Sequence, residues 1–537
     1  MIDGNQLWDE TLVSQLVSYN YYGKQMYTYA CAPKNLYQDL EHSVKRYPNK
    51  VVIVDEDNNR LTFAQFKNKV DKLASYLRFK KNVSKGDKIA LMLYNTPAFC
   101  IFVYAISKVG AVIVPINTKC KLYEWISLLS KLDVRLVFLD KRLKECENGL
   151  RKAYNNLDVV IVEDDAISQI DCDKNNVKDA YVETGWEDDL ILMFTSGTTS
   201  KSKGVVLTNF NVSNAILSYE KILKISSTDK TVIATPIYHI IGIVSLLGLF
   251  VHCGGTIHLQ LAYKPEKVLR CIIDQGLTLI HATPTVFIML LEKQKEFPKI
   301  PSLRKIICGS ANTPPRVIKE LHNWIPSMDF HTVYGLTESS SAAAIFPFDA
   351  AGSDKIGSSG LPIPGMLMKI VNDDGNEMKA GVPGELVIYG NVILHEYYNI
   401  KNNVLSNDGW FKTGDIAKFD KDGYVYIVDR KKDMICRGGE KIWSNEVENI
   451  IYKLNGVAEA ALIGVHDKKY GEVSMVVVKK RENIILSAQD VKEWVKAHMA
   501  KFKVPAYVVF VDELPKTRNG KIDKKALRDK YKCYGEE

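Results

Sequence analysis

Short apolar runs alternate with stretches of helical periodicity through the first half of this chain, and this alternation limits the folds open to it. Helical spacing occurs over 36–44 and again over 63–77. Apolar runs of strand length lie at 51–54, 89–93, 111–115 and 136–139. Such runs are typical of parallel strands with helices on both sides, because both faces of each strand are then buried. The alternation resumes from Leu190 to about Cys308, so we predict an α/β fold of layered parallel sheets.

The later part of the chain indicates two further units. Glycine, proline and short strands dominate 357–428, which predicts a β-rich subdomain. A charged run, Asp429-Arg430-Lys431-Lys432-Asp433, then separates the strand over 424–428 from a new α+β pattern. A length of 537 residues exceeds what one core normally serves. We therefore predict a large N-terminal domain, 1–431, and a small α+β C-terminal domain, 432–537.

Charge and cysteine content argue against several classes of function. The chain has 71 basic and 63 acidic residues, a net charge of +8, which does not indicate nucleic-acid binding. A local basic excess over 516–532 fits either a polyphosphate ligand or a solvated helix face. The ten cysteines form no CxxC pair, so we expect neither a zinc knuckle nor a disulfide scaffold. A cytoplasmic location is expected from this cysteine usage.

We expect no secretion signal and no transmembrane segment. Asp3, Asp9 and Glu10 stand where a signal peptide would be basic. The apolar run over 240–251 is shorter than the roughly 20 residues that cross a bilayer. This run predicts a buried core helix.

The segment after Leu190 combines an apolar strand with a loop rich in glycine and hydroxyl groups. Five residues between Thr195 and Ser200 carry hydroxyls, and Lys201 and Lys203 follow them. Backbone N–H groups and hydroxyls of such a loop can donate to phosphate oxygens while the lysines neutralise charge. The loop lacks the GxxxxGK[ST] pattern of a Walker A motif. A flexible surface turn is the alternative, although we prefer phosphate binding.

This loop resembles the TSG[ST]TGxPKG signature of the adenylate-forming superfamily. That superfamily includes acyl-CoA synthetases, aryl-CoA ligases such as those similar to 4-coumarate-CoA ligase, luciferases and the adenylation domains of peptide synthetases. Ser200 and Ser202 replace the usual glycine and proline. The resemblance extends from about residue 35 to 530, with further motifs in the family's order. It implies that the phosphates of ATP are bound by Thr195, Ser196, Gly197, Thr198, Thr199 and Lys203.

Three more motifs of the nucleotide site follow in order. The sequence over 334–338, YGLTE, resembles the family's YGxTE element, which implies that Tyr334, Gly335 and Thr337 bind the nucleotide. It also implies that Glu338 holds Mg²⁺, a cation that prefers hard oxygen ligands. The GWFKTGD motif over 409–415 implies that Asp415 accepts hydrogen bonds from the ribose hydroxyls. By the same resemblance, Arg430 contacts the nucleotide and Lys432 is the pivot between the two domains.

The C-terminal domain carries two motifs. The sequence over 437–442, RGGEKI, resembles the loop that lines the thiol tunnel, which assigns Arg437, Gly438, Gly439 and Lys441 to it. The sequence over 515–522, PKTRNGKI, resembles the segment whose lysine, here Lys521, reaches the acyl carboxylate and the α-phosphate. An ammonium in that place would stabilise charge that develops in the transition state. Without the resemblance, Lys521 would be an ordinary surface charge.

The motif over 236–242, PIYHIIG, resembles the one that borders the acyl pocket in fatty acyl-CoA and aryl-CoA ligases. This assigns His239 to the pocket, although a lone histidine beside an apolar helix is also common in a core. The resemblance places Gly309, Ser310, Ala311, Gly335 and Ser339 beside the acyl group. No aspartate occurs over 236–250 to pair a substrate ammonium, which disfavours an amino acid. A fatty acid and an aryl acid remain equally open.

Together these motifs imply a two-step ligase. A fatty or aryl acid reacts with ATP to give the acyl-adenylate and pyrophosphate, and the acyl group then passes to the thiol of coenzyme A with release of AMP. The resemblance implies ATP, Mg²⁺ and coenzyme A as cofactor and co-substrates, and Lys521, Thr337, Glu338 and His239 as catalytic residues. A free-standing acyl carrier protein is the alternative acceptor, and a non-catalytic nucleotide or acyl sensor is the alternative class. We expect a monomer or a homodimer.

Overall fold

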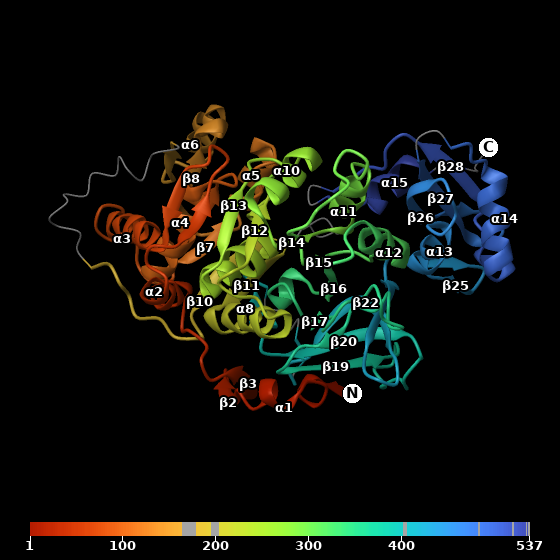
Figure 1. Ribbon diagram of the computed structural model, residues 1–537, viewed down its shortest axis with the longest axis horizontal. Coiled ribbons are helices and arrows are strands. Elements are labelled where there is room, and N and C mark those ends of the chain that lie inside the picture. Colours follow the sequence, from red (N-terminus) through yellow and green to blue (C-terminus); the bar gives the residue numbers. More distant parts are fainter. Residues whose placement is uncertain are drawn as a thin grey trace.

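The structure is a computed structural model of the chain, and it describes residues 1–163, 179–194, 203–400, 405–406, 408–481, 484–517, 520–532 and 534. A large body contains the N-terminal residues, and a smaller C-terminal unit lies beside it, drawn in blue in Figure 1. The large body holds two mainly parallel sheets, one antiparallel sheet and the hairpin of β2 (Leu16–Tyr21) and β3 (Lys24–Tyr29). No helix among the described residues is long and apolar enough to cross a membrane.

The first parallel sheet contains the predicted runs near residues 90, 113 and 137. Its strands, in order, are β21 (Glu396–Tyr397), β11 (Gly204–Thr208), β10 (Asp189–Phe194), β7 (Val112–Pro115), β6 (Lys88–Met92), β8 (Val134–Asp140) and β9 (Asp158–Val162). The five strands from β10 to β9 are parallel, while β11 returns antiparallel to β10. The sheet therefore carries the glycine-rich loop between β10 and β11.

The second sheet supplies the strand ends that face the small domain. Its strands, in order, are β18 (Leu361–Pro362), β17 (Ala344–Ile345), β16 (Asp329–Tyr334), β15 (Lys305–Gly309), β14 (Leu279–Ala282), β12 (Lys230–Ile233), β13 (Thr256–Leu259), β4 (Val51–Val54) and β5 (Arg60–Thr62). The strands from β16 to β4 are parallel. The predicted run at 51–54 is thus a strand, but it belongs to a different sheet from the runs that follow it.

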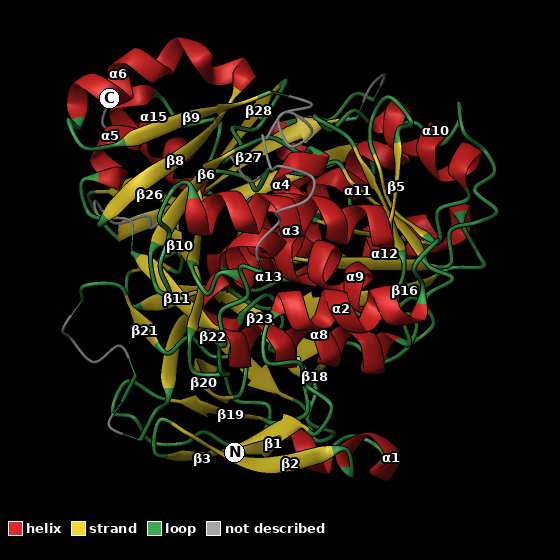
Figure 2. Ribbon diagram, turned by 90° about the vertical axis from the view of Figure 1, so that its left-hand side faces the viewer, coloured by secondary structure: helices red, strands yellow, loops and turns green. Residues whose placement is uncertain are grey.

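A helical layer fills the space between these two sheets and forms the main core. It consists of α2 (Leu36–Arg46), α3 (Phe63–Phe79), α4 (Pro97–Lys108), α8 (Asn209–Leu223) and α9 (Leu249–Cys253), whose buried residues share one apolar cluster with both sheets. Figure 2 shows these helices at the centre, with β6, β8 and β10 on one side and β5 and β16 on the other. The layered α/β prediction is confirmed.

The predicted core helix over 240–251 begins with an unusual turn. Residues Ile241–Gly248 form a π-helix, labelled η3, which continues into α9. The hydroxyl of Ser245 donates to the carbonyl of Ile241 at 2.9 Å. A side chain at Gly242 would lie 2.4 Å from the carbonyl oxygen of Ile237, so only glycine fits the start of this helix. π-Helical segments within helices are frequent at functional sites.

The predicted β-rich subdomain is an antiparallel sheet at the base of the large body. Its strands, in order, are β1 (Ile2–Asp3), β19 (Met366–Val371), β20 (Gly384–Gly390), β22 (Phe411–Phe419) and β23 (Val425–Arg430). All four neighbouring pairs are antiparallel. The extreme N-terminus therefore joins this sheet as an edge strand, which local sequence patterns did not predict (Figure 1).

The small domain is an α+β unit. Its sheet contains β25 (Glu440–Ile442), β24 (Ile435–Arg437), β27 (Gly471–Lys480), β26 (Val457–Asp467) and β28 (Tyr507–Val511), and its helices are α13 (Ser444–Ile451), α14 (Ala488–His498) and α15 (Lys524–Lys530). The predicted domain boundary after Lys431 falls between the last strand of one sheet and the first strand of the next.

Shorter elements complete the described fold. They are α1 (Glu10–Val13), α5 (Leu122–Leu129), α6 (Glu147–Ala153), α10 (Pro265–Gln275), α11 (Pro284–Leu291), α12 (Pro315–Trp324) and the 3₁₀ turns η1 (Gly4–Gln6), η2 (Lys141–Cys146), η4 (Thr337–Ser339) and η5 (Lys501–Lys503). Among them, α12 carries polar contacts to the small domain, and η4 lies within the predicted nucleotide site.

Candidate active site

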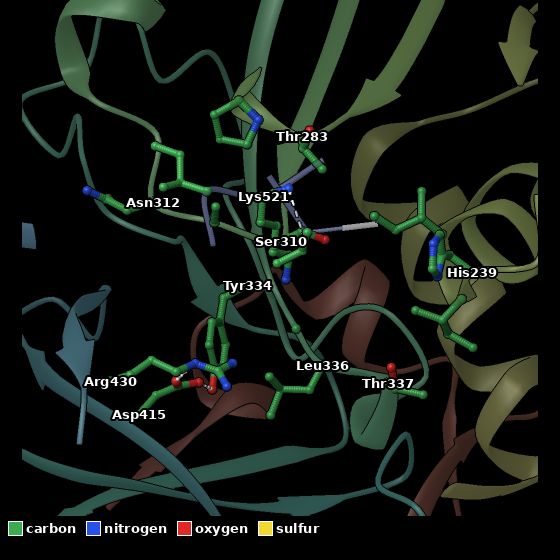
Figure 3. Close-up of a pocket in the computed structure, with 18 of the residues that line it drawn as sticks. His239, Thr283, Ser310, Asn312, Tyr334, Leu336, Thr337, Asp415, Arg430 and Lys521 are labelled. Atoms are coloured by element: carbon green, nitrogen blue, oxygen red, sulfur yellow. Dashed lines mark hydrogen bonds and ion pairs between the residues drawn. The ribbon is translucent and has the colours of Figure 1, made fainter. Parts of the chain in front are cut away.

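A cavity of about 1240 Å³ lies between the large and the small domain. Its walls include Ala282, Gly309 and Tyr334, the last residues of the parallel strands β14, β15 and β16. Ligands of open α/β sheets bind at such carboxyl ends. The small domain contributes Lys521 to the same cavity (Figure 3). The chain therefore brings the carboxyl ends of three parallel strands and the C-terminal motif to a single site.

One end of the cavity is built around the buried carboxylate of Asp415. The hydroxyl of Tyr334 donates to Asp415 Oδ2 at 2.7 Å, and Arg430 Nε lies 2.8 Å from Oδ1. Asp415 on β22 pairs directly with Arg430 on β23, so the register of the sheet fixes this contact. Burial raises the pKa of Asp415, while Arg430 and the Tyr334 hydrogen bond oppose that shift. A carboxylate has about four lone-pair sites, which leaves acceptor capacity for the two hydroxyls of a ribose.

The turn after β16 has room for glycine alone. A Cβ at Gly335 would lie 1.6 Å from the carbonyl oxygen of Ser341. This close approach places Thr337 and Glu338 on the cavity wall. The hydroxyl of Tyr397 donates to Glu338 Oε1 at 2.7 Å, and the ammonium of Lys203 lies 4.9 Å from the centre of the Tyr397 ring. The tyrosine thus links a carboxylate and a cation on one wall.

The donor set of this wall fits Mg²⁺ better than a metal held entirely by protein. The described residues contain no group of three or more histidine, cysteine or acidic side chains that could hold a metal. Mg²⁺ commonly takes one or two carboxylates and completes its shell with water and substrate phosphates. Glu338, beside the hydroxyl of Thr337, offers such a carboxylate.

Lys521 extends from the small domain into the cavity that Asp415 and Glu338 also line. A tight turn holds it: Thr517 N–H donates to the Lys521 carbonyl at 2.6 Å, and Lys521 N–H donates to Thr517 Oγ1 at 3.2 Å. Burial and the charge of Arg430 lower the pKa of Lys521 to about 8, against the opposing effect of Asp415 and Glu338. The ammonium is therefore close enough to these groups to interact with a ligand bound among them.

His239 lies on the opposite side of the cavity from Asp415 (Figure 3). Burial and the charges of Lys521 and Lys119 lower its pKa to about 3, so the imidazole is neutral at physiological pH. Its Nε2 atom is buried and has no hydrogen-bond partner in the part of the chain that the structure describes. A neutral ring of this kind can contact an acyl group without adding a charge.

The residues expected beside the acyl group divide into two sets. Gly309, Ser310, Ala311 and Gly335 line the cavity. Ser339 is not among the lining residues; it is buried, and its hydroxyl accepts a hydrogen bond from Leu336 N–H at 2.9 Å. Its role in the described structure is to hold the turn η4. Several lining residues were missed by the sequence reasoning, namely Tyr219, His281, Thr283, Asn312 and Thr332.

The predicted thiol-tunnel residues lie outside the cavity. Gly438 and Gly439 form the turn of the hairpin between β24 and β25, with φ of 55° and 91°. Neither glycine lines the cavity, nor do Arg437 and Lys441. The guanidinium of Arg437 instead lies 4.0 Å from the centre of the Tyr470 ring. In the orientation that places Lys521 in the cavity, the hairpin therefore lies outside it. The predicted pivot, Lys432, lines the cavity.

For the predicted phosphate loop, the structure describes only the residues on either side. Thr195, Ser196, Gly197, Thr198 and Thr199 lie outside the described residues. Phe194, at the end of β10, and Lys203, just before β11, both line the cavity.

Polar contacts hold the small domain against the large one. Arg316 on α12 donates through Nη1 to the carbonyls of Tyr452 and Leu454, at 2.8 and 3.1 Å. Glu320, also on α12, accepts two hydrogen bonds from Arg481 Nη2, at 3.1 and 3.0 Å. These contacts join α12 to the small domain.

Comparison with known proteins agrees with this geometry. The profile of AMP-binding enzymes matches residues 40–398, and that of their C-terminal domain matches 446–521. An indoleacetate-CoA ligase of Aromatoleum aromaticum is 31% identical over 484 residues, which cover 87% of this chain and 92% of that protein. The long-chain-fatty-acid-CoA ligase FadD13 of Mycobacterium tuberculosis is 31% identical over 477 residues, covering 88% and 93% respectively.

A solved structure extends the likeness to three dimensions. The o-succinylbenzoate CoA synthetase of Bacillus subtilis, in complex with its acyl-adenylate intermediate, has a TM-score of 0.80 and 28% identity. The match covers 93% of this chain and 98% of that one. The resemblance to adenylate-forming enzymes is confirmed, and the chain belongs to the AMP-binding enzyme family.

Proposed function

We propose that this protein is an AMP-forming acid-thiol ligase. It activates a carboxylic acid with ATP as the acyl-adenylate, releases pyrophosphate, and then transfers the acyl group to the thiol of coenzyme A with release of AMP. The observation that carries the proposal is the position of Lys521, which lines one cavity with Asp415, Arg430 and Glu338. The CoA ligases among the relatives support the choice of acceptor.

In the first step, the cavity residues orient the acid and ATP for in-line attack of the carboxylate on the α-phosphorus. Asp415 accepts hydrogen bonds from the ribose, while Lys203 and Arg430 lie beside the phosphates. Mg²⁺, held by Glu338, would neutralise charge on the phosphate oxygens. The Lys521 ammonium lies between the carboxylate and the α-phosphate and stabilises the charge that develops there. Phosphoryl chemistry of this type depends mostly on such positioning.

In the second step, the small domain rotates about Lys432 and replaces Lys521 by the hairpin of Gly438 and Gly439. The location of that hairpin outside the cavity supports this step, because it cannot guide a thiol to the adenylate from there. The contacts of Arg316 and Glu320 with the small domain are polar, which suits an interface that must open and reform.

The acid belongs to the fatty or aryl class in this proposal. The cavity segment over 236–250 has no aspartate for an amino-acid ammonium, and the relatives named above act on an aryl acid and on long-chain fatty acids. An acyl carrier protein is the second candidate for the acceptor. A cytoplasmic location, supported by eight free cysteines in the described chain, and a monomeric or dimeric state complete the proposal.

Exchange of radioactive pyrophosphate into ATP tests the first step. With an accepted acid, we expect wild-type exchange and at least a 100-fold loss in Lys521→Ala, on the scale found when one transition-state donor is removed. The affinity for ATP should change only a few-fold, because other residues hold the ribose and phosphates. Lys530→Ala, an exposed lysine on α15, is the matched control. If no acid supports exchange by the wild type, the chain is a non-catalytic binding protein.

A further inference from the structure

Four uncharged polar side chains form a cluster beside the cavity, and three of them line it. Three elements supply it: Tyr219 comes from α8, Ser245 from the π-helix η3 and His281 from β14, while Ser341 follows η4. The Tyr219 hydroxyl is 3.0 Å from Ser341 Oγ, and Ser341 Oγ is 3.4 Å from Ser245 Oγ. The rings of Tyr219 and His281 are 5.7 Å apart. We call these four residues the polar cluster.

The polar cluster is deeply buried, and yet it opens to the cavity. Tyr219, His281 and Ser341 line the cavity that also contains His239 and Lys521. The exposed fractions are 0% for Tyr219 and 3% for His281. Polar groups at this depth are normally hydrogen-bonded, because burial without a partner costs about 1–3 kcal/mol.

Several polar atoms around the cluster lack that partner. Within the described chain, His281 Nδ1 makes no hydrogen bond, and neither do Thr283 Oγ1 and Thr332 Oγ1, which line the same cavity. These three atoms and His239 Nε2 belong to residues that line one cavity, and each has unused hydrogen-bonding capacity. A substrate group that hydrogen-bonds there would remove an energetic penalty that an apolar chain would leave in place.

The cluster carries no charge. Burial alone lowers the pKa of His281 to about 3, with no charged group acting on it, so its ring is neutral at physiological pH. A second carboxylate or an ammonium on the substrate would be left here without a counter-charge, which is strongly unfavourable. A hydroxyl or a carbonyl group has no such requirement.

The nearby walls are apolar or small. Ile240, Ile241, Ile288 and Leu336 line the cavity together with Gly309. They suit a hydrocarbon body, whether aromatic or aliphatic, between the reacting carboxylate and the polar cluster.

We propose that the polar cluster binds a neutral hydrogen-bonding substituent, a hydroxyl or carbonyl group, on the acyl part of the acid. The substrate is then a hydroxy- or oxo-substituted fatty or aryl acid. An unsubstituted acid and a dicarboxylic acid are disfavoured. This inference rests on the proposed ligase function and names the substrate class of that ligase. His281 is the residue proposed to recognise the substituent.

Matched pairs of acids test the inference on the wild-type protein. Each pair differs by one group: cinnamic and 4-hydroxycinnamic acid, phenylacetic and 4-hydroxyphenylacetic acid, decanoic and 10-hydroxydecanoic acid. Acid-dependent pyrophosphate release gives kcat/KM for each. Because a hydrogen bond lost in a buried site costs about 1–3 kcal/mol, we expect the substituted member of at least one pair to be favoured by about 5-fold or more. Unsubstituted acids that react equally well or better in every pair would overturn the inference.

Variants connect that preference to His281. His281→Leu should bring the ratio within the preferred pair close to one, and His281→Asn, which retains hydrogen-bonding capacity, should restore part of it. His331→Leu is the matched control, because His331 on β16 is also a buried histidine with an unpartnered ring nitrogen in the described chain but does not line the cavity. The ratio should be unchanged in this control.

The outcomes separate the two proposals. If His281→Leu does not fold, Ser245→Ala provides the second variant, with a smaller expected fall in the same ratio. A ratio that survives both changes would overturn the role of the cluster. Turnover of unsubstituted acids alone would leave the ligase function standing and refute the substrate class, whereas no pyrophosphate exchange with any acid would refute the ligase function itself.

Discussion

The contacts of Arg316 allow a quantitative test of the domain rotation. Arg316 is on the large domain, and its Nη1 atom donates to two carbonyls at the end of α13, those of Tyr452 and Leu454. Its Nε atom donates to Glu320 at 2.7 Å, and Glu320 in turn accepts two hydrogen bonds from Arg481 of the small domain. Arg316→Ala removes the two hydrogen bonds to the carbonyls and also the hydrogen bond that holds Glu320 in place for Arg481. It changes no residue of the cavity.

The size of the effect follows from these bonds. A hydrogen bond to a charged donor contributes about 1.5–3 kcal/mol net, but the side chain of Arg316 is 22% exposed, and solvent weakens both bonds. A total of about 2 kcal/mol is then lost from the orientation with Lys521 inserted. Since 1.36 kcal/mol corresponds to a factor of ten, the ratio of the two orientations shifts by about 30-fold toward the open one.

The two half-reactions, measured separately, report this shift. Pyrophosphate exchange requires the inserted Lys521 and should fall in Arg316→Ala, by at most about 30-fold. Thioester formation from supplied acyl-adenylate requires the other orientation and should be unchanged or faster. Fluorescence energy transfer between labels on the two domains should show the open orientation more populated. Arg135→Ala, which removes an exposed ion pair with Asp87, is the control. Equal losses in both half-reactions, or no change in the energy transfer, would refute the reasoning.

Two further predictions concern pH. Lys521 acts as an ammonium, and its pKa in the free site is about 8, so kcat/KM for pyrophosphate exchange should fall as pH rises through about 8. Lys521→Arg should remove this alkaline decrease from the pH profile. If the decrease persists in the variant, another group causes it. His252 is held by Asp39 at 2.7 Å and by Glu220 at 3.4 Å, and these carboxylates raise its pKa to about 10 against the opposing effect of burial. Because the pKa of His252 is raised by folding, its stabilising effect is complete at pH values below the unfolded-state pKa of about 6.5 and is lost as pH rises toward 10. His252→Gln should therefore lower the free energy of unfolding by about 3–5 kcal/mol at pH 6, and this difference, measured by chemical denaturation, should shrink toward pH 10. A difference that does not change with pH would contradict a charged histidine.

The strands were predictable from sequence because both faces of each are buried. Runs such as 51–54 and 111–115 are apolar throughout, and the structure has β4 and β7 there. Their assignment to sheets was not predictable, because a local pattern does not say which neighbour a strand pairs with; β4 pairs with β13, far along the chain. The π-helical turn at Ile241 was equally hidden, since α and π turns share the same apolar composition.

The residues assigned to the nucleotide were easier to find in the sequence than those proposed to contact the acyl group. Tyr334, Asp415, Arg430 and Lys521 lie in short motifs, and the structure brings all four to one cavity. Tyr219 and His281 occur singly within an apolar helix and an apolar strand, where each looks like a core residue. A buried histidine in a run such as 277–282 was the available signal, but only the topology shows that it is at the cavity.

The charges at the site suggest why the two steps occur in order. Lowering the pKa of Lys521 from 10.5 to about 8 means that its inserted ammonium costs about 3 kcal/mol in the absence of ligand, at 1.36 kcal/mol per unit. Arg430 and Lys432 contribute to that cost as neighbouring cations. The phosphates of ATP would offset it and favour insertion. Departure of pyrophosphate removes most of that negative charge while the adenylate stays, so the cost returns just when the small domain must withdraw Lys521. The charges of the site would therefore favour insertion of Lys521 while ATP is bound and its withdrawal once pyrophosphate has left.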